Sequence, residues 1–146
     1  MAENNEIFKP IFGFEKMYSI SNLGNVRIEN TRIPSNFGKI KKCSISNSGY
    51  LRVHLSINKK RLYKTFFIHR LVAYHFLGNL NGKEYVNHKD GNRLNNDVEN
   101  LEWCTPKENT QHHIKNNPQW HKELKKRAWD NRHKTLKQYK YGTQFK

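Results

Sequence analysis

The spacing of apolar residues changes along the chain from a period of two to helical spacing, and this change predicts the first elements. In residues 50–55 apolar and polar side chains alternate, the pattern of a half-buried strand. A second strand-like run covers 62–66, and the polar residues 58–60 predict a hairpin turn between them. Residues 68–76 then place apolar side chains at helical spacing, with Gly78 as a stop signal.

A strand, a polar loop, a strand and a helix are predicted next. Residues 85–88 and 101–103 are short strand-like runs, and the intervening 89–100 is dense in Asn, Asp and Gly. The run Thr105-Pro106-Lys107-Glu108 has an N-cap residue, a proline at the first helical position and a capping-box acid. A helix should therefore begin there and continue toward Ile114.

The final part of the chain begins with another helix-start signal at Asn117-Pro118. Apolar side chains recur on one side of the predicted helix, at Trp120, Leu124, Ala128 and Trp129. From Pro118 onward there are nine Lys or Arg and two acids. The pattern predicts a basic amphipathic helix; a helix docked on the core with a solvated charged face is the alternative.

These elements predict an α+β protein in three regions. Residues 6–80 form a small β-rich segment, in which the aromatic side chains Phe12, Phe14 and Tyr18 are expected to be buried. Residues 81–117 hold the strand, loop, strand and helix, and residues 118–146 form the basic helical tail. A chain of 146 residues is sufficient for one small domain with an appended arm.

The charge balance indicates a polyanionic partner. The net charge is +15, from 27 Lys and Arg against 12 Asp and Glu, and no acid occurs between Glu29 and Glu84. A polyphosphate partner, such as a nucleic acid, explains this acid-free basic stretch better than scattered solubility charges do. The residues expected to contact phosphates are Lys39, Lys41, Lys42, Arg52, Lys59, Lys60, Arg61, Lys125, Lys126 and Arg127.

Other compositional features narrow the setting. No long apolar run or signal peptide is visible, so a membrane role is not expected. The two cysteines, Cys43 and Cys104, form no CxxC pair, which argues against a disulfide framework and fits a reducing interior. We therefore expect a cytoplasmic protein, acting as a monomer or weak dimer.

A candidate site follows from the predicted helix start. If Thr105 is the N-cap, Asn109 and His113 lie four residues apart on one helix face, a spacing at which two side chains can hold one ion. The preceding hairpin should bring Asn87 and His88 close to that helix. Because adjacent strand residues point to opposite faces, these two need a local twist to share a site.

The motifs in this region resemble those of the HNH endonucleases, most closely the phage and intron-encoded homing branch. The residues that carry the resemblance are Tyr85–Asn92, Asn95-Asn96-Asp97, Asn100–Trp103 and Thr105–Asn109. The N-terminal runs Pro10–Glu15 and Tyr18–Arg27 resemble a motif that often precedes this nuclease module.

The resemblance implies a ββα-metal fold, of the His-Me finger type, and a nuclease that cuts or nicks DNA. By position, His88 corresponds to the general base and Asn100 to the central asparagine that braces the loop. Asn87, Asn109 and His113 correspond to metal ligands. Asn87 stands where an acid often occurs and Asn109 where a histidine often occurs. Weak neutral ligands completed by substrate phosphate favour Mg2+ or Mn2+ over Zn2+.

Three alternatives stay open. His112 competes with His113 if the helix phase shifts by one residue. A zinc set of Cys104, His88, His112 and His113 is less favoured because Cys104 lacks a ligand-pair spacing. The neutral ligands also leave a non-catalytic nucleic-acid-binding protein with a degenerate HNH module as the alternative function.

Overall fold

The computed structural model describes residues 5–30, 34–57, 62–79 and 81–141. Backbone contacts divide the chain into one unit at residues 1–106 and a second at 107–146. The predicted DNA-contacting residues Lys59, Lys60 and Arg61 lie outside the described residues. Within the part of the chain that is described, no helix has the length and apolar character needed to cross a bilayer.

The described residues of the first unit form three small antiparallel sheets. β1 (Phe8–Pro10), β2 (Tyr18–Ser21) and β3 (Val26–Ile28) form the first, and β4 (Ser44–Ile45), β5 (Leu51–Ile57) and β6 (Leu62–Phe67) form the second. β7 (Tyr85–His88) and β8 (Leu101–Cys104) form the third. Short 3-10 helices occupy Pro34–Asn36 (η1) and Val98–Asn100 (η3).

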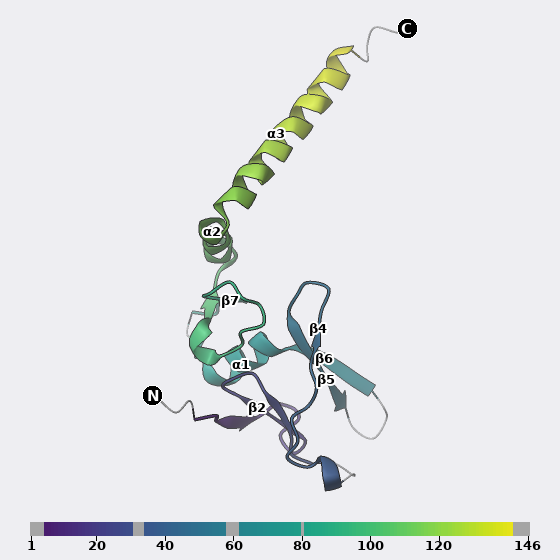
Figure 1. The fold of residues 1–146 in the computed structure, drawn as a ribbon, viewed down its shortest axis with the longest axis vertical. Coiled ribbons are helices and arrows are strands. Elements are labelled where there is room, and N and C mark those ends of the chain that lie inside the picture. The colour runs from purple at the N-terminus through teal and green to yellow at the C-terminus, as the bar shows by residue number, and fades with distance from the viewer. Residues whose placement is uncertain (1–4, 31–33, 58–61, 80, 142–146) are drawn as a thin grey trace. The chain divides into compact units, whose positions relative to one another are not determined.

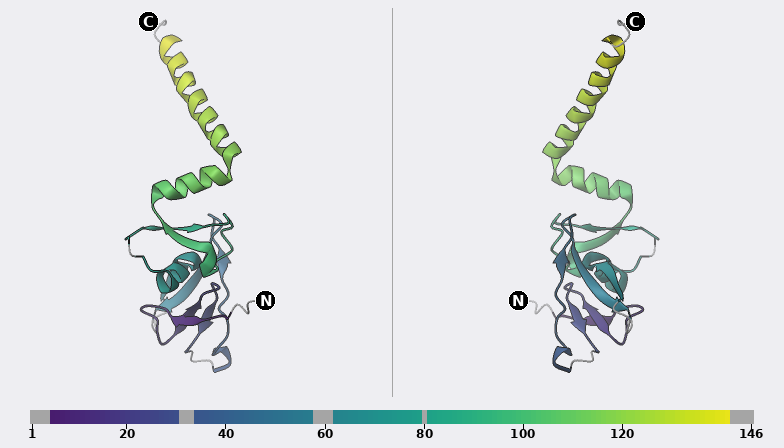
Figure 2. Two further views of the ribbon diagram at one scale, coloured as in Figure 1. Left: turned by 90° about the vertical axis from the view of Figure 1, so that its left-hand side faces the viewer. Right: turned by 90° about the vertical axis from the view of Figure 1, so that its right-hand side faces the viewer.

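The helix α1 (Ile68–Phe76) is the centre of the first unit, and Figures 1 and 2 show the sheets arranged around it. Ile68, Leu71 and Val72 of this helix belong to the same buried cluster as Val53 and Leu55 of β5. Val86 and Leu101 of the third sheet also join this cluster. The core thus ties the β7–β8 hairpin to the preceding sheets.

The predicted strands and helices of this unit are confirmed. β5 and β6 pair in register from Arg52 with Phe67 to Ile57 with Leu62. Val53 and Leu55 are fully buried while His54 is exposed, as the alternation requires. α1 covers the predicted 68–76.

One expectation about the core was wrong. Phe14 and Tyr18 are buried, but Phe12 is 75% exposed. Phe12 follows the first short strand and stacks on the His75 ring at 4.9 Å between centroids, while its backbone N–H donates to His75 Nε2. The ring therefore lies against the side of α1 rather than inside the core.

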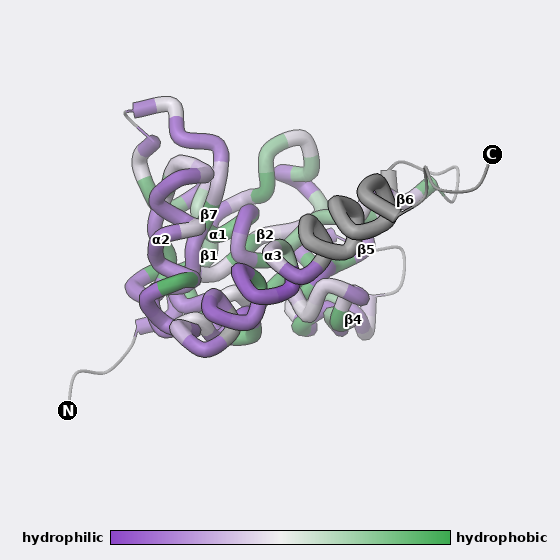
Figure 3. The backbone as a smooth tube through the Cα atoms, turned by 90° about the horizontal axis from the view of Figure 1, so that it is seen from above, coloured by the Kyte–Doolittle hydropathy of each residue, from purple (hydrophilic) through white to green (hydrophobic). Residues whose placement is uncertain are grey.

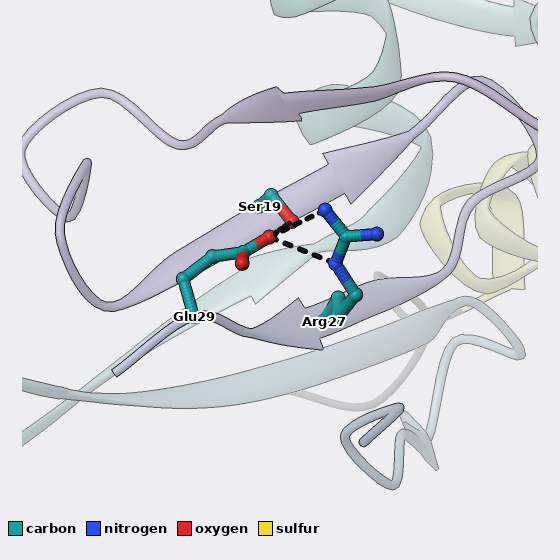
Figure 4. Close-up of polar contacts among 3 residues, drawn as sticks. All are labelled: Ser19, Arg27 and Glu29. Atoms are coloured by element: carbon teal, nitrogen blue, oxygen red, sulfur yellow. Dashed lines mark hydrogen bonds and ion pairs between the residues drawn. The ribbon is translucent and has the colours of Figure 1, made fainter. Parts of the chain in front are cut away.

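A polar cluster stabilises the first sheet. Glu29 accepts hydrogen bonds from Ser19 Oγ and from Arg27 Nε, and forms an ion pair with Arg27 (Figure 4). Burial raises the pKa of Glu29, but the Ser19 hydrogen bond and the Arg27 charge outweigh it, so the pKa is lowered. The Glu29 carboxylate therefore stabilises the first sheet and is not a candidate functional residue.

The second unit is helical. α2 begins at Pro106, as the capping signal predicts, and continues to Asn116, two residues beyond Ile114. α3 (Pro118–Tyr141) begins at the predicted proline. Figure 3, which colours the chain by residue hydropathy, shows that the coloured residues of both helices are mainly hydrophilic. Leu124 and Trp129 are 46% and 61% exposed, so within this unit they are not core residues.

Candidate active site

The β7–β8 hairpin buries two polar side chains at the end of its first strand. Asn87 is 8% exposed and His88 is 4% exposed. Buried polar groups are costly unless they are hydrogen-bonded, so their partners define the site. Both residues were predicted from the sequence; their partners were not.

Asn96, in the loop after β7, holds the imidazole of His88. His88 Nε2 lies 3.3 Å from Asn96 Oδ1, and Asn96 Nδ2 donates to the Leu94 carbonyl at 3.0 Å. The second bond fixes which end of the Asn96 amide faces His88. Because an amide oxygen only accepts, Nε2 of His88 carries the proton and Nδ1 is the basic nitrogen.

The protonation state of His88 also suits a base. Burial lowers its pKa, the Asn96 hydrogen bond and the Asp90 charge act in the opposite direction, and the Arg93 charge lowers it again. The net shift is downward from the ordinary value of 6.5. Neutral imidazole therefore predominates at physiological pH.

Aromatic rings pack against His88 on its buried side. The His69 ring of α1 lies 5.3 Å from the His88 ring, and the Tyr50 ring lies 4.7 Å from His69 and 5.9 Å from His88. The Arg93 guanidinium sits 4.9 Å from the Tyr50 ring centre and donates to the Ser48 carbonyl at 2.7 Å. These contacts fix the position of the His88 ring through residues that are far away in the sequence.

Asn100 joins the two ends of the loop. Its Nδ2 donates to Asp90 Oδ1 and to the Asn95 carbonyl, both at 2.9 Å. Its Oδ1 accepts from the Asp90 N–H at 3.1 Å, and its carbonyl accepts from the Lys89 N–H at 2.8 Å. The side chain thus links the turn after β7 to η3 and braces the loop. No described hydrogen bond joins it to His88.

Other residues of the loop also stabilise it through hydrogen bonds within the loop. Asp90 accepts from the Asn92 N–H at 2.7 Å and from Asn95 Nδ2 at 2.8 Å, so both of its carboxylate oxygens are engaged. Gly91 has φ of 74°, which permits the tight turn after His88. These hydrogen bonds pair the polar side chains of the loop with one another and with its backbone.

The first sheet also contacts this loop. The Val98 N–H donates to the Asn22 carbonyl at 2.8 Å. A Cβ placed on Gly24, which has φ of 86°, would lie 2.9 Å from the Asn96 Cβ. The turn after β2 therefore packs directly behind the residue that holds His88.

Asn87 points its amide at the facing strand. Its Nδ2 donates to Glu102 Oε1 at 2.9 Å, and the two residues are register partners across the hairpin. Glu102 was not singled out from the sequence. The amide oxygen of Asn87, the atom with metal-binding chemistry, is directed away from Glu102.

The remaining predicted ligands belong to the second unit. Asn109 and His113 lie one turn apart on α2, Asn109 half-buried and His113 exposed, and His112 is half-buried beside them. Among the described residues, no group of three or more His, Cys, Asp and Glu gathers as a metal site. Each of the predicted ligands offers an amide oxygen or an imidazole nitrogen, which are neutral donors that bind a divalent cation weakly.

The predicted DNA-contacting residues that the structure describes lie at the surface. Lys39 and Lys42 are exposed, while Lys41 and Arg52 are half-buried. Arg52 Nε donates to Ser44 Oγ at 3.3 Å, which holds it on the β4–β5 pair. On α3 the side chains of Lys125, Lys126 and Arg127 are all exposed.

A strand ending in a buried histidine, an asparagine-braced loop, a second strand and a helix follow one another in this chain. That order and those residues define the ββα-metal class of nuclease module. The comparison with known families agrees. The HNH endonuclease family matches residues 66–111, and the NUMOD4 motif matches residues 6–56.

Individual proteins give the same result. The DNA endonuclease I-HmuI of Bacillus phage SP01 is 41% identical over 107 residues, which are 73% of this chain and 57% of that protein. An uncharacterized HNH endonuclease of Acanthamoeba polyphaga mimivirus is 43% identical over 127 residues, 80% of this chain and 28% of that protein. A solved structure on DNA binding and cleavage by the homing endonuclease I-HmuI superposes with a TM-score of 0.63 and 41% identity, over 76% of this chain and 59% of that one.

The chain therefore carries an HNH endonuclease domain preceded by a NUMOD4 motif, and the sequence-based predictions of this family and of the ββα-metal fold are confirmed. The matched region spans between 23% and 57% of the curated relatives that head the comparison.

Proposed function

We propose that this protein is a metal-dependent endonuclease that hydrolyses DNA phosphodiester bonds, as a phage- or intron-type homing or nicking enzyme. The observation that carries the proposal is the arrangement of His88. It is buried, its pKa is lowered, and its Nε2 is held by Asn96, which leaves Nδ1 as the basic nitrogen. The family match and the named activity of the I-HmuI relative support the same reaction class.

The proposed mechanism assigns the proton transfer to His88. Neutral imidazole accepts a proton from the attacking water at Nδ1, while the Asn96 hydrogen bond at Nε2 stabilises the resulting imidazolium. The attack displaces the 3′ oxygen and leaves a 5′-phosphate. A bound divalent cation would neutralise phosphate charge and stabilise the departing oxygen. Asn100 acts at a distance, by keeping the loop that holds Asn96 in place.

The proposed metal ligands are Asn87, Asn109 and His113, with Mg2+ or Mn2+ as the ion. The support for Asn87 is its oriented amide, and the support for the other two is their position in the family motif and their spacing on α2. Because the ligands are neutral, affinity for the ion should be low before DNA binds.

Double-stranded DNA is the proposed substrate. Its phosphates would contact the exposed and half-buried basic side chains described above on the first unit and on α3. One active site per chain fits a monomer that nicks one strand. We place this activity in the cytoplasm of a bacterial or phage-infected cell, in line with the phage origin of a relative.

The proposal is tested by nicking of supercoiled plasmid with Mg2+ or Mn2+. His88→Ala should abolish nicking while DNA binding and metal binding persist. Asn109→Ala and His113→Ala should instead regain part of the activity at higher metal concentration, since they lose affinity for the ion. A wild-type protein that binds DNA yet nicks none with either metal would favour the non-catalytic alternative.

A further inference from the structure

Asn87 faces Glu102 across the hairpin, and the mechanism above gives Glu102 no role. Asn87 is buried, Glu102 is half-buried, and a 2.9 Å hydrogen bond joins them across the hairpin. We propose that Glu102 is a positioning residue for the metal site: it orients the Asn87 amide and supplies the negative charge that the neutral ligand lacks. This inference rests on the proposed function.

The orientation follows from the chemistry of the two groups. A carboxylate can only accept a hydrogen bond, so the Asn87 nitrogen must face Glu102 and the amide oxygen must face the other way. Without that acceptor, the two ends of the amide are nearly equal in shape and the side chain can turn over. A turned amide would present N–H groups, which repel a cation.

The charge follows from the composition of the site. Asn87 is neutral, and hard divalent cations prefer anionic oxygen donors. Asp90 is also an acid of the loop, but its two oxygens are engaged by Asn92, Asn95 and Asn100. A carboxylate that accepts from a ligand amide makes the amide oxygen more negative, and such supporting partners are worth about 10–100-fold in metal affinity.

A purely structural role predicts something different. A polar cross-strand pair contributes about 0.2–1 kcal/mol to hairpin stability, and its loss would affect folding without affecting the ion selectively. The fixed register between Asn87 and Glu102 is compatible with both roles. Metal binding must therefore be measured apart from stability and apart from cleavage.

The test measures Mn2+ binding by the loss of the free-ion EPR signal, in the presence of duplex DNA and in a His88→Ala background that prevents cutting. Glu102→Gln keeps an oxygen that can accept from Asn87 and removes the charge, while Glu102→Ala removes both. We expect Glu102→Gln to weaken Mn2+ binding by about tenfold, and Glu102→Ala to weaken it further. Glu99→Gln is the matched control, since it removes one exposed charge from η3 and should leave binding unchanged.

A second variant tests whether the charge can be moved. In the Asn87→Asp, Glu102→Gln double variant, the acid stands at the ligand position and the Gln amide can donate to it. We expect its Mn2+ affinity to equal or exceed that of the parent. Denaturant unfolding without metal checks that each variant is folded.

The outcomes separate this inference from the proposed function. Unchanged Mn2+ binding in both Glu102 variants would overturn it, as would equal weakening by Glu99→Gln. Failure of the double variant to regain affinity would also overturn it. Absence of DNA cleavage by the wild type would contradict the proposed function but not this inference, because the Mn2+ titrations require no cleavage.

Discussion

His69 should make the fold sensitive to mild acid. Its side chain is 7% exposed between the rings of Tyr50 and His88, and its Nδ1 is buried with no hydrogen-bond partner among the described residues. Burial first, and then the charges of His88 and Arg70, lower its pKa from 6.5 to about 3. The folded protein therefore keeps this ring neutral, whereas the unfolded chain takes up a proton near pH 6.5.

The sign and size of the effect follow from this difference. The contribution of the neutral His69 ring to the free energy of unfolding is fully present above pH 6.5. It is lost as the pH falls from there toward 3, because the unfolded chain binds the extra proton. At about 1.4 kcal/mol per pKa unit, the free energy of unfolding should drop by about 2 kcal/mol between pH 7 and 5 and by about 3 kcal/mol at pH 4. That is a large share of the roughly 5–15 kcal/mol typical of a small domain.

Urea unfolding followed by tryptophan fluorescence at pH 7, 6 and 5 measures the drop. His69→Phe keeps an aromatic ring and cannot titrate, so it should remove about 2 kcal/mol of the pH dependence. Some dependence should remain, because the pKa of His88 is also lowered. His54→Gln removes an exposed histidine on β5 and serves as the control. Equal wild-type stability at pH 7 and 5, or an undiminished slope in His69→Phe, would refute the reasoning.

Three further predictions concern activity and the loop. Since the pKa of His88 is lowered, the cleavage rate should rise with pH and reach half of its maximum below pH 6.5. A pH–rate profile with a midpoint above pH 6.5 would contradict a buried neutral base. Gly24→Ala should cost about 1–3 kcal/mol of stability and reduce cleavage, because its Cβ would meet Asn96 at 2.9 Å with φ of 86°. Gly13→Ala is the control for backbone strain alone, because the φ of Gly13 is 77° and no described atom lies within 4 Å of the added Cβ. An equal loss of cleavage in both variants would argue against a role for the contact between residue 24 and Asn96. Neutralising Lys39, Lys41 and Lys42 together should lower the slope of log affinity against log salt by about three units for all DNA sequences. Fluorescence anisotropy measures this slope, and an unchanged slope would exclude these lysines from the DNA-binding surface.

Local sequence determined most of the elements around the site. The alternation in 50–55, the helical spacing in 68–76 and the capping signal at Thr105–Glu108 each involve neighbours within a few positions. Such short-range patterns are set by backbone geometry and solvent exposure, so they can be recognised without knowing the fold. The three-residue strand at Phe8–Pro10 was not predicted, because so short a segment has no measurable period.

The motif likewise indicated His88, Asn87 and Asn100, but their partners depend on contacts that no local pattern contains. Arg93 bonds to Ser48, 45 positions earlier in the chain, and Tyr50 and His69 meet at His88 from two other elements. These groups come together because α1 buries its apolar face against several sheets at once.

The pairing of Asn87 with Glu102 shows the same division. The sequence predicted both strands, yet a long loop between two strands does not fix their register. The Asn100 bonds to Asp90 and Asn95 fold that loop, and the folded loop sets which residues face each other. Sequence alone therefore predicted the strands and helices around the site and His88 as the candidate base. The tertiary structure decided which side chains orient it, because those contacts depend on the packing of segments that are distant in the chain.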